Sequence, residues 1–76
     1  MSFYKFWYIY AELHRLRIRV EDIAQNMGMS ASSFRRKLAG KAPWTLPEMY
    51  MLTALIGADT HDWDKLFPNI YEEAKG

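Results

Sequence analysis

Glycine residues divide this 76-residue chain into stretches that each read as a short helix. Gly28, Gly40 and Gly57 each directly follow a helical segment, and glycine readily takes the left-handed conformation found after a helix end. The segments show no strand-like alternation of apolar and polar residues, and the chain contains no internal repeat or linker. We therefore expect a single all-α domain over residues 1–76, a compact bundle of about five short helices.

The expected helices are short, and they cover residues 3–16, 20–27, 31–39, 46–56 and 61–67. In the first, apolar residues recur at spacings of three and four, which is typical of a helix with one buried face. The residues expected to face the core are Phe6, Ile9, Leu13, Leu16, Ile23, Ala24, Met27, Phe34 and Leu38. These positions define the inner side of the predicted bundle.

Capping residues mark where several helices begin. Ser30 is a favourable N-cap for the third helix, and Thr45 is followed three residues later by a glutamate, the spacing of a capping box. Thr60 is expected to cap the short fifth helix, which Pro68 ends. Residues 68–76 are expected to form a C-terminal tail.

Composition limits the classes of protein to which the chain can belong. Half of the residues are apolar and 16% are aromatic, which is typical of a packed domain. There is no cysteine, so disulfides and thiolate metal sites are excluded. The apolar opening, residues 2–11, contains Lys5, is too short to span a bilayer and lacks the pattern of a signal peptide. We expect a cytoplasmic protein without membrane contact.

No residue pattern indicates catalysis or a cofactor. His14 and His61 are far apart in the sequence, and neither has ligand-type neighbours at metal-binding spacing. Asp59, Asp62 and Asp64 lie near His61, but acids are common in the first turn of a helix. There is also no glycine-rich phosphate loop and no nucleophile paired with a base. We expect neither an enzyme nor a bound metal or cofactor.

Positive charge is concentrated in the first half of the chain. Residues 1–41 hold eight Lys and Arg against three acids, whereas residues 42–76 hold two against six. Arg35, Arg36 and Lys37 are consecutive on one expected helix, where neighbouring like charges repel by a few tenths of a kcal/mol. Such a cluster can keep a surface soluble, or it can bind phosphate with release of counterions.

The segments 20–27 and 31–39, joined at Gly28, have the lengths of a helix-turn-helix. Ala24 is small, as close crossing of the two helices requires. The stretch "VEDIAQNMGMSASSFRRKLAGK" resembles the helix-turn-helix of phage Cro/CI-type regulators, with the motif at 20–40. The resemblance, which extends over residues 9–67, implies a lambda-repressor-like fold and a small transcriptional regulator that binds double-stranded DNA.

The resemblance also implies which residues contact DNA, with helix 30–39 in the major groove. Small side chains at the start of this helix allow close approach, while its cations reach base edges or phosphates. Arg35 and Arg36 are expected to read bases or hold phosphates, and Lys37 and Lys41 to contact phosphates. The full predicted set is Ser30, Ala31, Ser32, Ser33, Arg35, Arg36, Lys37 and Lys41.

An alternative function is protein binding. Val20 and Ala31 stand where Cro/CI-type regulators often place polar side chains, which favours a modulator or antirepressor that binds a repressor. Six of the twelve aromatic residues also lie within residues 3–10, and they cannot all face one core. These aromatic residues are either core residues or part of a dimer or partner surface. The C-terminal region is a second candidate for such a surface. The aromatic candidates for this surface are Phe3, Tyr4, Trp7 and Tyr8.

Overall fold

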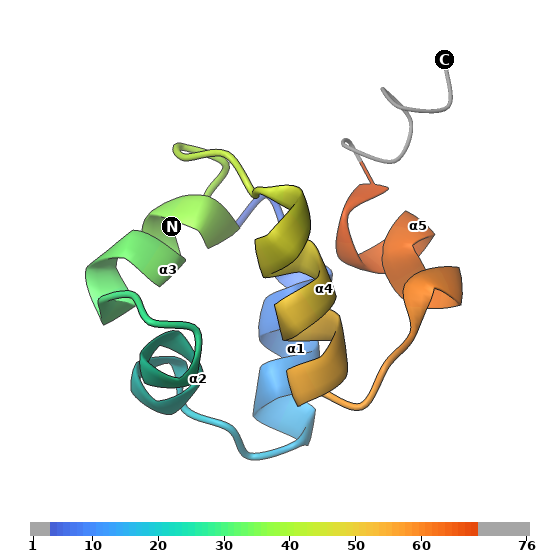
Figure 1. The fold of residues 1–76 in the computed structure, drawn as a ribbon, viewed down its shortest axis with the longest axis horizontal. Helices are drawn as coiled ribbons and strands as arrows, with labels where there is room; N and C mark the ends of the chain where they lie inside the picture. Colours follow the sequence, from blue (N-terminus) through green and yellow to red (C-terminus); the bar gives the residue numbers. More distant parts are fainter. Residues whose placement is uncertain (1–3, 69–76) are drawn as a thin grey trace.

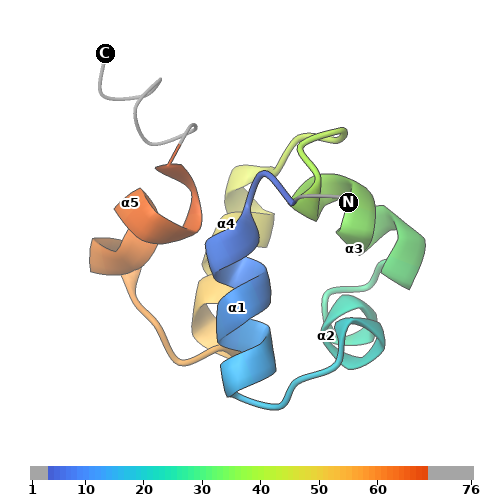
Figure 2. The same ribbon diagram turned by 180° about the vertical axis from the view of Figure 1, so that it is seen from behind.

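The structure, a computed structural model, describes residues 4–68 and contains helices and no strand in that range. The helices are α1 (Trp7–Arg15), α2 (Val20–Asn26), α3 (Ala31–Leu38), α4 (Leu46–Leu55), the 3-10 turn η1 (Thr60–Asp62) and α5 (Trp63–Leu66). α1 and α4 lie in the middle of the molecule, with α2 and α3 on one flank and α5 on the other (Figure 1, Figure 2). The expected all-α fold of about five helices is confirmed for this part of the chain. None of these helices has the length and apolarity needed to cross a membrane.

The first helix begins later than predicted, at Trp7 rather than at residue 3. The backbone N–H of Phe6 donates to the carbonyl of Leu38 at 2.9 Å, so the segment before α1 is held against the end of α3. Residues 1–3, which include Phe3, lie outside the described residues, as do residues 69–76 of the expected tail. The other three long helices end within one residue of their predicted ends.

The fifth helix begins differently from the prediction that Thr60 caps it. Asp59 is the capping residue: its carboxylate accepts the His61 backbone N–H at 2.8 Å. The Asp59 N–H in turn donates to the carboxylate of Asp62 at 3.2 Å. These reciprocal bonds close the 3-10 turn η1, in which Thr60 is the first residue, before the short helix α5 begins.

The core forms one cluster, and the prediction of its residues is largely confirmed. All the predicted inward residues are buried except Leu16, which is half-buried. Trp44, in the α3–α4 connection, is also buried, and its ring meets those of Phe6, Phe34 and Phe67 edge-on at 5.4 to 6.1 Å. Edge-to-face pairs of this kind add to the stabilisation from burial alone. They join the start of the chain, α3 and the end of α5.

The turn between α2 and α3 fixes the position of α3. Gly28 has φ of +74°, a conformation that costs glycine little. Its N–H donates to the Gln25 carbonyl and the Met29 N–H to the Ala24 carbonyl, both at 3.0 Å, which satisfies carbonyls at the end of α2. Ala24 is fully buried, so α2 and α3 can approach closely.

Candidate functional site

The first turn of α3 uses several of the predicted contact residues for its own structure. The hydroxyl of Ser30 accepts the Ser33 backbone N–H at 3.1 Å and donates to the Ser33 hydroxyl at 3.1 Å, as a helix N-cap does. Ala31 is half-buried against the core. Ser32 is exposed, and its side chain makes no hydrogen bond within the described residues. Only Ser32 in this turn therefore presents an uncommitted polar group.

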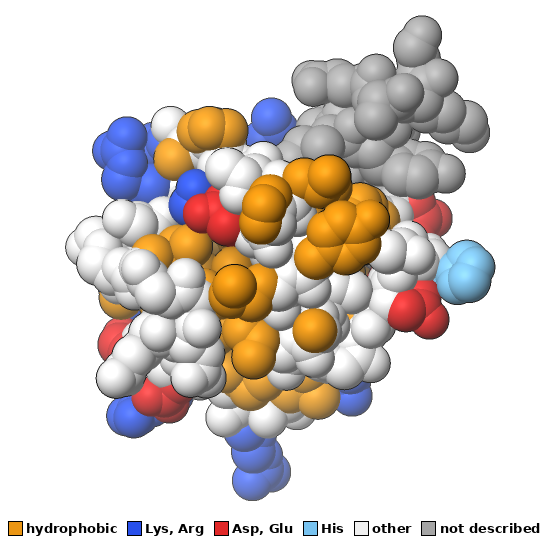
Figure 3. All heavy atoms as spheres, viewed as in Figure 1, with side chains coloured by type: hydrophobic (Ala, Val, Ile, Leu, Met, Phe, Trp, Pro, Cys, Tyr) orange, Lys and Arg blue, Asp and Glu red, His pale blue; other side chains and the backbone are white. Residues whose placement is uncertain are grey.

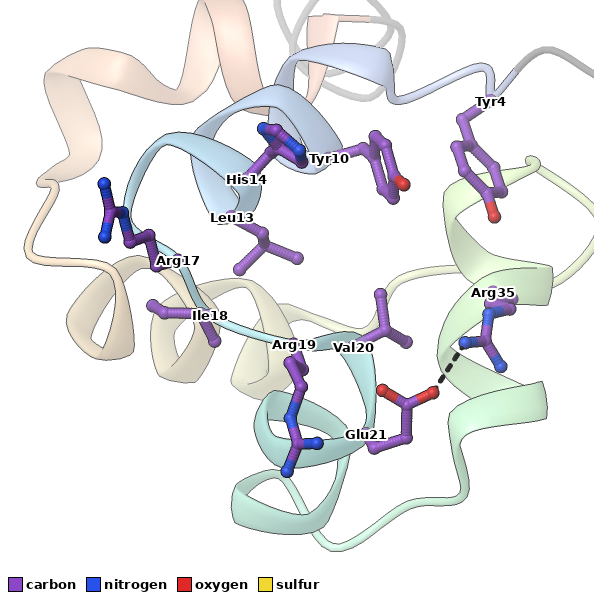
Figure 4. A pocket seen from close by; sticks show the side chains of 10 residues that line it. All are labelled: Tyr4, Tyr10, Leu13, His14, Arg17, Ile18, Arg19, Val20, Glu21 and Arg35. Atoms are coloured by element: carbon purple, nitrogen blue, oxygen red, sulfur yellow. Dashed lines mark hydrogen bonds and ion pairs between the residues drawn. The ribbon is translucent and has the colours of Figure 1, made fainter.

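The three consecutive cations of α3 point in different directions, because successive residues on a helix are about 100° apart. Arg35 points toward α2, where its Nη2 lies 2.8 Å from Oε2 of Glu21 (Figure 4). The pKa of Glu21 is lowered, first by a hydrogen bond from its own backbone N–H and then by Arg35. Arg35 is thus paired within the molecule, although about half of its side chain stays exposed.

Lys37 points the other way, toward α4, and it is not placed as the predicted phosphate contact. Its Nζ donates to the Pro43 carbonyl at 2.7 Å and lies 3.0 Å from Oε1 of Glu48. Only 13% of the Lys37 side chain is exposed, because position 37 lies on the inner side of α3. Its charge is balanced inside the molecule and holds the α3–α4 connection.

The Arg36 side chain points in a direction between those of Arg35 and Lys37, and it is exposed to solvent. It forms no ion pair or side-chain hydrogen bond with any residue between 4 and 68. Ser32 lies one helical turn earlier on the same face. The backbone N–H of Lys41 donates to the Arg36 carbonyl at 2.9 Å, so Lys41 follows directly at the end of the helix. We call Ser32, Arg36 and Lys41 the α3 outer face.

The aromatic residues at the start of the chain divide between core and surface. Phe6 is buried, and Tyr4 and Tyr8 pack partly against the core. Trp7 is 66% exposed and Tyr10 is 42% exposed. The core alternative therefore holds for Phe6, while a partner surface stays a prediction for the exposed residues of this segment. Only Trp7 and Tyr10 extend substantially into solvent among those described.

A second apolar surface, which the sequence analysis missed, lies on α4. Four large side chains of this helix are exposed, and apolar atoms gather over it in Figure 3. We call them the α4 apolar face: Leu46, Tyr50, Met51 and Leu55. The signal was present in the segment "LPEMYMLTAL", which has one charged residue and apolar residues all round the helix. A helix of that composition cannot bury every apolar side chain against one core.

The histidines and acids form no metal site in the part of the chain that the structure describes. His61 Nδ1 lies 3.3 Å from Asp59 Oδ1, and both side chains are exposed. No three potential ligands come together there.

No family model matches the chain, and neither does any curated protein or any solved structure.

Proposed function

We propose that this protein is a small transcriptional regulator that binds double-stranded DNA with α3 in the major groove. The observation that carries the proposal is the α3 outer face, where Ser32, Arg36 and Lys41 make no side-chain contact that would satisfy their polar groups. Such groups are available to an external partner. Likeness to Cro/CI-type, lambda-repressor-like regulators is part of this proposal and rests on the sequence pattern alone.

The arrangement of α2 and α3 supports this proposal. In helix-turn-helix proteins the second helix enters the major groove while the first lies across the backbone. Here α2 packs against α3, Ala24 of α2 is fully buried, and the turn at Gly28 joins the two helices. The pairing of Arg35 with Glu21 adds a charged contact between the same two helices. We infer that Arg35 positions α3 and that Arg36 contacts DNA.

Each residue of the α3 outer face has a chemically defined role in this proposal. The Arg36 guanidinium can donate two hydrogen bonds to a guanine edge or can neutralise a phosphate. The Ser32 hydroxyl can bond a base or the backbone, and the Lys41 ammonium suits a phosphate. The number of uncommitted cations is small, so we expect modest affinity and a shallow salt dependence for a monomer.

The experiment that tests the proposal is selection from a random duplex-DNA library at about 150 mM salt. Wild type is compared with Arg36→Ala and with Lys65→Ala, which removes a cation from α5 instead of α3. We expect wild type and Lys65→Ala to enrich the same motif, and Arg36→Ala to lose it. If no variant enriches a motif, or if Arg36→Ala behaves as wild type does, the proposal is wrong.

The α4 apolar face favours a second candidate function, binding of a protein partner such as a repressor or a second copy of the chain. Exposed apolar clusters on small soluble domains commonly mark contact surfaces. Trp7 and Tyr10 offer another such surface on α1. A salt titration separates the two functions, because DNA binding through phosphate contacts weakens as salt rises, even at the shallow slope expected here, whereas an apolar protein interface does not weaken.

A further inference from the structure

A cavity of about 520 Å³ opens between the C-terminal half of α1, the α1–α2 connection and α3 (Figure 4). Leu13, Ile18 and Val20 give it an apolar floor, and Leu13 and Val20 are buried. Tyr4 and Tyr10 also line it, with their rings 5.0 Å apart. We call this cavity the α1–α3 groove. Its volume lies within the range of sites for small organic ligands, and its lining combines an apolar floor with charged side chains.

Of the three arginines that line the α1–α3 groove, two form ion pairs with acidic side chains and Arg17 does not. Arg35 pairs with Glu21 at 2.8 Å, and Arg19 pairs with Asp22 at 3.0 Å. Arg17 makes no ion pair with any residue between 4 and 68, and it lies at the opposite end of the groove from Arg35 in Figure 4. Arg17 thus places one uncompensated guanidinium at the rim of the groove, which favours a ligand that carries one negative charge.

The backbone conformation of Arg17 is a second, independent indication that the α1–α3 groove is a ligand site. Arg17 has φ of +59° and is the one residue other than glycine with positive φ between residues 4 and 68. It occupies the position after α1 that Gly28 and Gly57 occupy after α2 and α4, with φ of +74° and +73°. This conformation costs energy for a residue with a Cβ atom. Strained residues of this kind gather at ligand sites, where the side chain is needed.

We propose that the α1–α3 groove binds a small aromatic carboxylate. The carboxylate pairs with the Arg17 guanidinium, which can donate two parallel hydrogen bonds to it. The aromatic ring lies on the apolar floor formed by Leu13 and Ile18, which are the floor residues next to Arg17 in Figure 4. A doubly charged phosphate ester fits less well, since its second charge meets only arginines that are already paired.

The test titrates 1-naphthoate, and separately its neutral analogue 1-naphthamide, into the isotopically labelled full-length protein without DNA. We expect 1-naphthoate to cause saturable shifts in the amide NMR signals of residues 13–21, with a dissociation constant of about 1 mM or below. The neutral analogue should bind about threefold more weakly or worse, because it cannot form the ion pair. Arg17→Gln should weaken 1-naphthoate by a similar factor.

Arg15→Gln is the matched control, because Arg15 is exposed, lies two residues away and pairs with Glu12. It should leave the affinity for 1-naphthoate unchanged. Any one of three results would overturn the proposal. These are no saturable shift up to about 10 mM probe, equal affinity for both probes, and equal effects of the Arg15 and Arg17 substitutions. Since no DNA is present, the result does not depend on whether the chain binds DNA.

Discussion

The ammonium group of Lys37 lies 3.0 Å from Oε1 of Glu48, an ion pair that joins the last turn of α3 to the first turn of α4. The same carboxylate oxygen accepts the Thr45 backbone N–H at 2.9 Å as part of a capping box. Lys37 also donates to the Pro43 carbonyl and lies 6.0 Å from the centre of the Trp44 ring. One cation thus connects two helices and the loop between them, which explains why α3 carries a lysine on its inner side.

A double-mutant cycle with Lys37→Met and Glu48→Gln should measure this connection. Glutamine keeps the capping acceptor at position 48, so the cycle isolates the charge. Both side chains are mostly buried, so we expect a coupling of about 1 kcal/mol in the free energy of unfolding, at the upper end for ion pairs near a surface. Urea denaturation of the four proteins gives the value. Effects that add within about 0.3 kcal/mol would contradict a structural role for the pair.

Acid should weaken the fold in part through Glu48. Partial burial acts to raise its pKa, but hydrogen bonds from the Thr45 N–H and Lys37 outweigh burial, so the pKa lies below its usual 4.5. A lowered folded-state pKa adds stability that is present above pH 4.5 and is lost as pH falls through the lowered value. Urea denaturation at about pH 7 and about pH 3 should show a smaller loss for Glu48→Gln than for wild type. Glu12 and Glu21, with pKa values also lowered, should account for part of the remaining loss.

Helix positions could be predicted because they depend on residues close together in the sequence. The spacing of Ile9 and Leu13, the cap at Ser30 and the turn at Gly28 each act over a few residues, and the structure agrees with them. Asp59 shows where local signals are insufficient. Asp59 and Thr60 are both good capping residues, and the reciprocal bonds with an acid three residues on decide in favour of Asp59.

The contacts of α3 could not be predicted in the same way. Whether Arg35 or Lys37 is available to DNA depends on Glu21 and Glu48, which lie on other helices and meet them only after the chain packs. The sequence therefore predicted a cationic helix correctly but could not separate Arg36 from its paired neighbours. The α4 apolar face was missed for a similar reason, since an apolar helix does not reveal which side the core covers.

Arg17→Gly should leave the protein as stable as wild type or more stable. Glycine relieves the left-handed strain at position 17, at the cost of greater freedom in the unfolded chain, so we expect a gain of about 0.5 kcal/mol. Gly57→Ala is the reverse change at an equivalent helix end, where nothing lies within 4 Å of the added Cβ. It should cost about 1 kcal/mol, again measured by urea denaturation. A loss of stability in Arg17→Gly would mean that the arginine side chain stabilises the fold.

Leu52 and Leu55 should respond very differently to truncation, although both lie on α4. Leu52 is fully buried, so Leu52→Ala should cost about 3 kcal/mol in the free energy of unfolding through lost burial and a cavity. Leu55 is 40% exposed and belongs to the α4 apolar face, so Leu55→Ala should cost about 1 kcal/mol or less. Thermal or urea denaturation of both variants checks the comparison. Equal costs would show that a partner or a second copy covers this face in solution.

The salt dependence of DNA binding should separate Arg36 from Lys37, which are adjacent and carry the same charge. Each phosphate neutralised contributes about 0.9 to the slope of log affinity against log salt. If Arg36 binds a phosphate, Arg36→Ala should reduce that slope by about one unit. Lys37→Met should leave it unchanged, because this lysine already pairs with Glu48. Circular dichroism at the assay temperature ensures that both variants are folded. Equal changes in slope would show that pairing inside the molecule does not decide which cations reach DNA.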